Sequence, residues 1–178
     1  MHKGRITVAV IAGIGLLSTL FPWIEVWEMG MERGIVYDLG TRLEYGFQSW
    51  YGYLAMFFFM LIAAFALMGK KGNMIAKGIP KMAILVLSGL ILLEGILILI
   101  IAGLSVTLSP QAGIYIMMIV SLCTAVAPYL FKADGTVEIP SVKEVIDDIE
   151  DSAEIVEDKA EAAADKIEDK YGLEVTHL

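Results

Sequence analysis

Residues 80–104 read PKMAILVLSGLILLEGILILIIAGL, and this run decides the fold class. Between Lys81 and Leu104 it contains a single ionisable residue, Glu94. A helix of this length extends about 37 Å, which is enough to cross a hydrocarbon core of ~30 Å. Three more apolar runs of comparable length lie at about 6–27, 50–68 and 110–131. Because lipid offers the backbone no hydrogen-bond partners, we expect four transmembrane helices over these four runs.

The composition of the whole chain agrees with this expectation. Of the 178 residues 57% are hydrophobic, and the mean hydropathy is +0.71. Residues 1–132 carry 9 Lys and Arg against 6 Asp and Glu, a net charge of +3, whereas residues 133–178 carry 4 Lys against 15 acids, a net charge of −11. We therefore expect a transmembrane domain over 1–132, a linker over 133–140 and an acidic segment in water over 141–178.

The first apolar run also has some features of a secretory signal peptide, because Lys3 and Arg5 precede it. The run is longer than the apolar core of such a peptide, however, and no A-x-A-like cleavage site follows it. We therefore expect a retained helix.

The charges of the short loops predict the orientation in the membrane. The basic residues gather before the first helix and between the second and third, at Lys3, Arg5, Lys70, Lys71, Lys77 and Lys81. The loop over 28–49 has 2 Arg against 4 acids, and the turn over 105–109 has no charge. By the positive-inside rule, both termini are cytoplasmic in a multi-pass protein of the cytoplasmic membrane. Ser109-Pro110 predicts an N-cap and first turn for the fourth helix.

The outer loop over 28–49 is far longer than a connection requires, and apolar residues alternate with polar ones along it. The alternating apolar positions are Trp27, Met29, Met31, Ile35, Tyr37, Leu39, Leu43, Tyr45 and Phe47. Arg33-Gly34 and Gly40-Thr41 supply turn-like breaks between three stretches. We predict a small extracytoplasmic β-meander whose apolar face covers the bundle end or contacts a partner or a second copy.

Four helices with a long, strand-bearing first outer loop and a short second one form a layout that resembles the claudin-like tetraspan proteins. The resemblance concerns topology alone. The outer loop has no cysteine pair, since Cys123 is the single cysteine of the chain, and it has no matching tryptophan–glycine signature. The resemblance therefore implies a layout, and we predict no membership of that family.

Glu94 is the one intramembrane candidate for a functional residue. An acid at the middle of a membrane helix costs ~2.5–3.5 kcal/mol on insertion scales, so such residues usually have a partner. The candidate partners are hydroxyl groups, on Ser18, Thr19, Ser121 or Thr124, or a neighbouring chain. Two hypotheses follow: Glu94 is a neutral, hydrogen-bonded packing residue, or it is a proton or ion site.

The acidic segment predicts a long amphipathic helix over about 142–171. Ser141 and Glu144 have the spacing of a capping box, and Gly172 is a natural stop. The apolar positions follow heptad spacing over more than three heptads, at Val142, Ile146, Ile149, Ala153, Val156, Ala160, Ala163 and Ile167. This tail seam predicts a weak coiled coil or a contact with a cytoplasmic helical partner; a single solvated helix is the alternative.

The sequence has no motif for catalysis, cofactor binding or metal binding. It has no Gly-rich phosphate loop, and its only histidines, His2 and His177, are terminal. Its longest basic run is Lys70-Lys71, so we expect no nucleic-acid partner. Our main hypothesis is a non-enzymatic membrane scaffold or accessory subunit, acting as a homo-oligomer or within a larger membrane complex. A small oligomeric channel that uses Glu94 is the alternative, and a membrane-embedded enzyme is third.

Overall fold

The computed structural model describes residues 3–32, 35–68, 75, 79–131 and 136–171. The described chain is mostly helical, with five α-helices and a small three-stranded antiparallel sheet. In order along the chain its elements are α1 (Lys3–Ser18), β1 (Pro22–Glu32), β2 (Ile35–Tyr45), the 3₁₀ turn η1 (Gly46–Gln48), α2 (Trp50–Leu67), α3 (Ile79–Leu104), β3 (Leu108–Pro110), α4 (Ala112–Val126), the 3₁₀ turn η2 (Ala127–Tyr129) and α5 (Val142–Tyr171).

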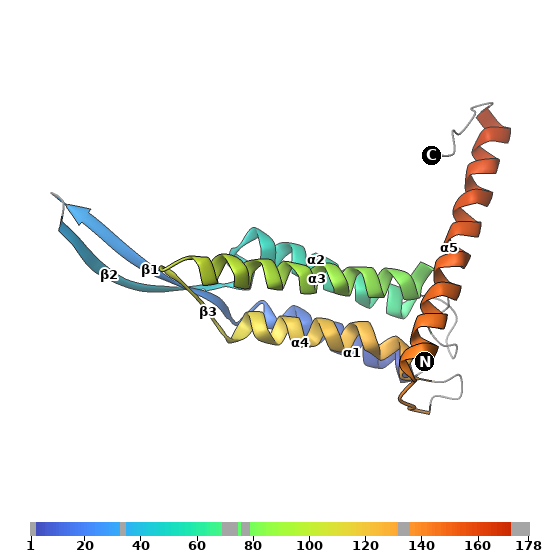
Figure 1. The fold of residues 1–178 in the computed structure, drawn as a ribbon, viewed down its shortest axis with the longest axis horizontal. Coiled ribbons are helices and arrows are strands. Elements are labelled where there is room, and N and C mark those ends of the chain that lie inside the picture. Colours follow the sequence, from blue (N-terminus) through green and yellow to red (C-terminus); the bar gives the residue numbers. More distant parts are fainter. Residues whose placement is uncertain (1–2, 33–34, 69–74, 76–78, 132–135, 172–178) are drawn as a thin grey trace.

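The first four helices lie side by side as a bundle, from which the β1–β2 hairpin projects at one end and α5 at the other (Figure 1). Three segments are long and apolar enough to cross a membrane: α2, α3 and the continuous stretch Ala112–Tyr129. They suggest a multi-pass membrane protein. The bounds of α2 and α3 agree with the predicted helices over 50–68 and 80–104 to within one residue.

The first predicted helix, over 6–27, is too long by about nine residues, because α1 ends at Ser18 and β1 begins at Pro22. Pro22 restricts the residue before it to extended backbone, which disfavours a continuing helix. Beyond Pro22 the chain is aromatic and β-branched, and it pairs with strands on both sides. Apolarity alone did not separate this strand from the helix before it.

The sheet also differs from the predicted three-stranded meander within 28–49. Its strand order is β2–β1–β3, and β3 comes from the connection between α3 and α4. The stretch over 35–45 is one strand, and Gly40 lies inside it with a φ of +102°. The register shifts between the pairs Glu28–Gly40 and Met29–Asp38, so the predicted turn at Gly40 is a β-bulge.

The predicted start of the fourth helix at Ser109-Pro110 is wrong as well, since both residues belong to β3. The backbone N–H of Trp27 donates to the carbonyl oxygen of Thr107 (2.8 Å), and the backbone N–H of Gln111 donates to the carbonyl oxygen of Trp23 (2.8 Å). These bonds hold the connection against β1, and α4 begins at Ala112. Pro110 is tolerated there because β3 is an edge strand, where a missing N–H costs little.

The tail helix α5 spans the range that the capping box and Gly172 predict. The Ser141 backbone N–H donates to Glu144 Oε2 (2.7 Å), and the Glu144 N–H donates to Ser141 Oγ (3.2 Å). The N–H groups at the start of a helix have no acceptor within the helix, and these two reciprocal bonds give an acceptor to the N–H groups of Ser141 and Glu144. The chain then runs across the end of the bundle instead of continuing its axis, and α5 extends well past it (Figure 1).

Candidate functional site

Glu94 lines a groove on the outside of the bundle, between α2 and α3. The groove has a volume of about 370 Å³, within the range of small-molecule sites. Trp50, Tyr51, Leu54 and Phe58 line it from α2, and every α3 side chain that lines it apart from Glu94 is leucine or isoleucine. We call this hollow the Glu94 groove. It is an apolar surface feature with one carboxyl group, about 22 Å along α3 from its first residue.

The Glu94 carboxyl group has no hydrogen-bond partner among the described residues. Both of its oxygens are shielded from solvent by the surrounding side chains. A polar group in this condition is costly in an apolar environment. The structure thus leaves Glu94 with an unmet requirement for a donor or acceptor.

The four hydroxyl groups that the sequence offered as partners are all engaged elsewhere. Each is buried and donates to a backbone carbonyl oxygen: Ser18 to Gly15 (2.6 Å), Thr19 to Leu16 (2.7 Å), Ser121 to Ser88 (2.5 Å) and Thr124 to Val120 (2.7 Å). Three of these bonds lie within the hydroxyl's own helix or its final turn, and the fourth joins α4 to α3. No bond from any of them to Glu94 is present.

The β1–β2 hairpin has a cluster of three charged side chains on one face near the bundle, and exposed apolar side chains on the other. Arg42 lies between Glu28 (3.7 Å) and Glu44 (2.8 Å), and these three residues share one face by the strand register. Trp27 and Met29 lie on the opposite face of β1, and they are 45% and 54% exposed. The hairpin therefore presents uncovered apolar side chains beyond the bundle.

The bulge at Gly40 breaks the single apolar face that the alternation predicted. Met29 lies opposite Asp38, and the register pairs Met31 with Val36 instead of with Ile35 or Tyr37. The side chains of Met31, Ile35 and Tyr37 lie outside the described part of the structure. The other predicted positions lie in different places: Leu39 at the bulge, Leu43 opposite Glu25, Tyr45 opposite Pro22, and Phe47 in η1.

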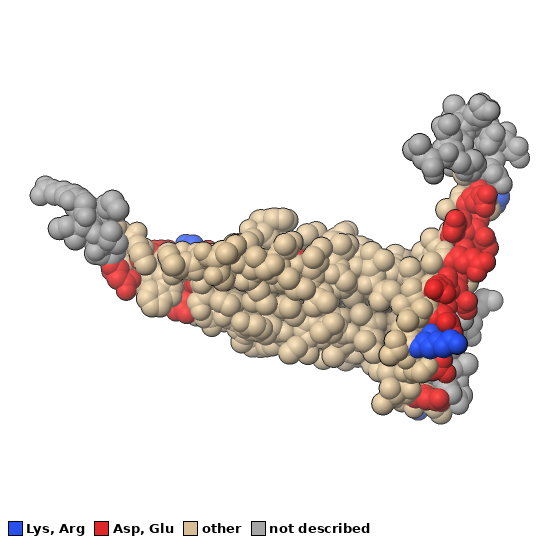
Figure 2. Space-filling view, in the orientation of Figure 1, with Lys and Arg blue, Asp and Glu red and all other residues tan. Residues whose placement is uncertain are grey.

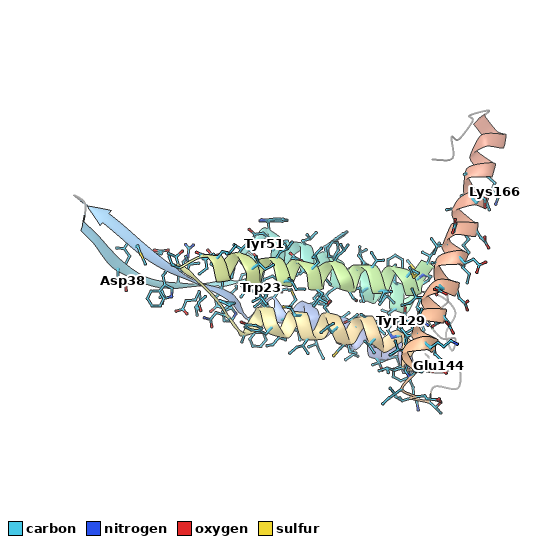
Figure 3. The ribbon with its side chains drawn as sticks, viewed as in Figure 1. Trp23, Asp38, Tyr51, Tyr129, Glu144 and Lys166 are labelled. Carbon is cyan, nitrogen blue, oxygen red and sulfur yellow. The ribbon has the colours of Figure 1, made fainter. Side chains whose placement is uncertain are left out.

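Trp23 joins the hairpin to the bundle, a role that the sequence analysis did not assign. Its side chain is 2% exposed, and Nε1 donates to the carbonyl oxygen of Ser18 (3.1 Å). Its ring lies where a side chain on Gly46 or Gly113 would otherwise project. Figure 3 places Trp23 at the point where the strands leave the helices. The signal was present, since a tryptophan directly after a helix-breaking proline is a poor candidate for a helix end.

The tail helix is held to the bundle by a buried ion pair that was likewise not predicted. The Lys81 ammonium group, in the first turn of α3, pairs with the Asp148 carboxylate of α5. The same ammonium group lies 4.2 Å from the centre of the Tyr129 ring, which adds a cation–π contact. Lys81 is 5% exposed, so this junction brings α3, α5 and the end of α4 together.

The predicted tail seam is only partly in contact with the bundle. The most buried positions of the described α5 are on a neighbouring face, with Ser152 fully buried and Val145 and Asp148 half-buried. Ile149 and Val156 of the seam are half-buried, whereas Val142, Ile146, Ala153, Ala160 and Ala163 are exposed. The side chain of Ile167 lies outside the described part of the structure. Most of the seam is thus free for another contact.

Acidic side chains follow α5 along its length, whereas the face of the bundle shown in Figure 2 is almost without charge. Within the described residues, no group of three or more His, Cys, Asp or Glu side chains has the arrangement of a metal site. The molecule therefore offers two kinds of surface: apolar ones on the bundle and hairpin, and an acidic one on α5.

Comparison with protein-family models, curated proteins and solved structures found no match for this chain.

Proposed function

We propose that this protein is a non-enzymatic integral membrane scaffold or accessory subunit, which acts by assembling with itself or with a larger membrane complex. One observation carries the proposal: two elements leave the bundle at opposite ends with uncovered faces. These are the β1–β2 hairpin and the far half of α5 (Figure 1). The described core is formed by residues of the helices and η2, together with Ile75 and with Trp23 at the base of β1, so neither the projecting part of the hairpin nor the far half of α5 is needed to complete it.

The hairpin supports the proposal because an isolated two-stranded ribbon is marginally stable in water. β3 pairs with β1 as far as Val26, and the Trp27 N–H still donates to the carbonyl oxygen of Thr107, so beyond Trp27 the described ribbon consists of β1 and β2. β2 is an edge strand over 11 residues. An exposed edge beside exposed Trp27 and Met29 has the properties of a surface that another chain covers.

The far half of α5 supports the proposal from the other end. Its seam positions Ala160 and Ala163 are exposed, and acids flank them at Glu157, Asp158 and Glu161. An amphipathic helix with a free apolar stripe and a negative surface suits a helical cytoplasmic partner with basic flanking residues. The lipid bilayer itself is a poor partner for this helix, because anionic headgroups repel acidic side chains.

The proposed topology has four membrane spans, with α1 as the fourth and both termini in the cytoplasm. α1 packs along α2 and α4, and its Arg5 Nε donates to the carbonyl oxygen of Ala66 (2.8 Å) at the end of α2. Arg5 and Lys81 thus lie at the end of the bundle that carries α5. The acids Glu25 and Glu28 lie on the hairpin at the opposite end. This distribution agrees with the positive-inside rule.

Cysteine labelling tests the topology. In a Cys123→Ala background, Leu39→Cys in the hairpin (60% exposed) is expected to react with a membrane-impermeant maleimide on intact cells. Ile139→Cys, next to α5 and 87% exposed, is expected to react only after the membrane is permeabilised. Equal labelling of both sites on intact cells, or the reverse pattern, contradicts cytoplasmic termini.

Particle stoichiometry tests the assembly. Native mass spectrometry of the full chain in mild detergent is expected to give a defined particle larger than one chain. Substituting serine for both Trp27 and Met29 is expected to remove the part of that assembly that depends on the hairpin. Glu28→Gln, on the opposite face of the same strand, is the matched control and should leave the particle unchanged. A lone monomer for the native chain rules out the proposed function.

A further inference from the structure

The Glu94 carboxyl group is shielded and has no hydrogen-bond partner among the described residues. Inside a membrane, acids are rare and usually paired with another polar group. The hydroxyl groups of Ser18, Thr19, Ser121 and Thr124 are bonded to backbone oxygens. Ser88 Oγ is buried and forms no hydrogen bond among the described residues, so it does not pair with Glu94 either. Within the described part of the chain, the partner that Glu94 requires is therefore missing.

The membrane restricts where such a partner can come from. Copies of one chain share one orientation in the bilayer, so a residue in one copy meets residues at its own depth in the next. At the level of Glu94, Gly95 packs against Met117 and Met118 of α4. Ser88, Ser121 and Thr124 are at most 1% exposed, so these hydroxyls are not on the outside of the bundle. Trp50 and Tyr51 also line the groove, but they are not among the buried groups that lack a hydrogen-bond partner in the described chain, whereas both Glu94 carboxyl oxygens are. In a second copy, the unpaired carboxyl group that faces this groove is Glu94 itself.

We infer that the Glu94 groove is the contact surface for a second copy of this chain, and that each Glu94 side chain turns outward from its shielded position so that the two carboxyl groups hydrogen-bond to each other across a two-fold axis normal to the membrane. A carboxylic acid offers one O–H donor and one acceptor oxygen. Two such groups related by a two-fold axis satisfy each other, as an isologous contact requires. The inference rests on the proposed function, because it names the copy of this chain as one partner in the assembly.

The apolar side chains around Glu94 suit a helix–helix contact. Leu93 and Leu97 on α3 are 53% and 51% exposed, and they flank Glu94 at spacings of one and three residues. Leu90 and Ile101 continue the same stripe above and below. In the proposed dimer, the stripe of each copy packs into the groove between α2 and α3 of the other copy. Van der Waals packing and hydrogen bonds are the forces that associate helices in lipid, and both are present on this surface.

Disulfide cross-linking in native membranes tests the contact. In the Cys123→Ala background, Leu97→Cys is expected to form a cross-linked dimer under mild oxidation, because the two-fold axis brings this position close to its copy. Leu122→Cys on α4 is the matched control, since Leu122 is also 51% exposed but lies on another face. Equal cross-linking at both positions indicates random collision and overturns the inference.

The role of the carboxyl group is tested in the full chain by comparing Glu94→Gln with Glu94→Leu. An amide offers both a donor and an acceptor, so Glu94→Gln is expected to keep the dimer. Glu94→Leu has neither and is expected to weaken dimerisation about tenfold, measured as the shift of the monomer–dimer curve with detergent concentration. The monomer should still fold, because the change removes a polar group that has no partner within the described chain.

The outcomes separate this inference from the proposed function. A native chain that is monomeric and alone contradicts the proposed function and this inference together. An assembly that survives Glu94→Leu unchanged contradicts the inference alone. A single copy whose groove retains a lipid or another lipophilic molecule, lost on Glu94→Leu, also overturns it by giving Glu94 a different partner.

Discussion

Gly52→Ala is expected to destabilise the fold more than any other single methyl addition to the described glycines. A Cβ on Gly52 would overlap the carbonyl oxygen and carbon of Gly46, which are backbone atoms and have no rotamer by which to move away. The cost of overpacking is usually ~1–3 kcal/mol, and we expect about 3 kcal/mol or more here. The measurement is the midpoint of thermal unfolding in detergent.

The reason lies in how the hairpin returns to the bundle. Ser49 caps α2 by accepting from the Gly52 N–H (3.1 Å), and its own N–H donates to the Gly46 carbonyl oxygen (3.1 Å). The first turn of α2 is thereby pressed onto η1. A Cβ at Gly52 must either break this cap or separate α2 from Gly46, and both changes shift Trp23 from its seat against Gly46.

Gly89→Ala is the matched control for this change. Gly89 lies in the interior of α3, and a Cβ there would meet no atom within 4 Å. Alanine is the better helix former by ~0.5–1 kcal/mol, so this variant should be neutral or slightly stabilising. Equal loss of stability in both variants contradicts the backbone contact at Gly46.

Lys81→Met is expected to release α5 from the bundle. Lys81 and Asp148 are 7% and 20% exposed as side chains, so Lys81→Met removes the cation of a largely buried ion pair. Breaking a buried pair by removing one partner costs about 3 kcal/mol, at the lower end of the usual range. The undocked state should therefore become about a hundredfold more populated, measured as faster amide hydrogen exchange over the first half of α5.

Two further variants identify the cause of that release. Lys159→Met removes an exposed lysine of α5 and should leave exchange unchanged. Combining Lys81→Met with Asp148→Leu removes both charges and should restore part of the protection, since an apolar pair of similar volume can replace a buried ion pair. If the double variant exchanges as fast as Lys81→Met alone, the charge left on Asp148 is not the cause of the release of α5. Tyr129, beside the junction in Figure 3, then becomes the next residue to test.

Much of the molecule could be predicted from local features of the sequence. The apolar runs over 50–68 and 80–104 predicted α2 and α3 to within one residue, because in lipid a long apolar segment must satisfy its backbone internally. The start of α5 at Val142 follows from Ser141 and Glu144, which act on donors only three residues apart. Signals of this kind act over short stretches of chain, and they were sufficient for the type and the bounds of α2, α3 and α5.

The candidate site depended on contacts between distant residues. The end of α1 and the start of α4 were mispredicted because strand β3 pairs with β1 more than eighty residues earlier, and the apolar run gives no sign of that pairing. Lys81 and Asp148 are 67 residues apart, so their ion pair was equally invisible. That Glu94 lacks a partner became evident only once every hydroxyl near it had been placed.

The sequence by itself determined that the chain has long membrane-length helices, a strand-forming loop after the first and an acidic amphipathic tail. Only the tertiary structure decided where α1 gives way to β1, that the sheet takes its third strand from the α3–α4 connection, and that Glu94 borders an outer groove. The physical reason is the range of the interactions involved. Backbone satisfaction and capping act between near neighbours in the chain, whereas strand pairing, ion pairing and the burial of a carboxyl group depend on which distant residues the fold brings together.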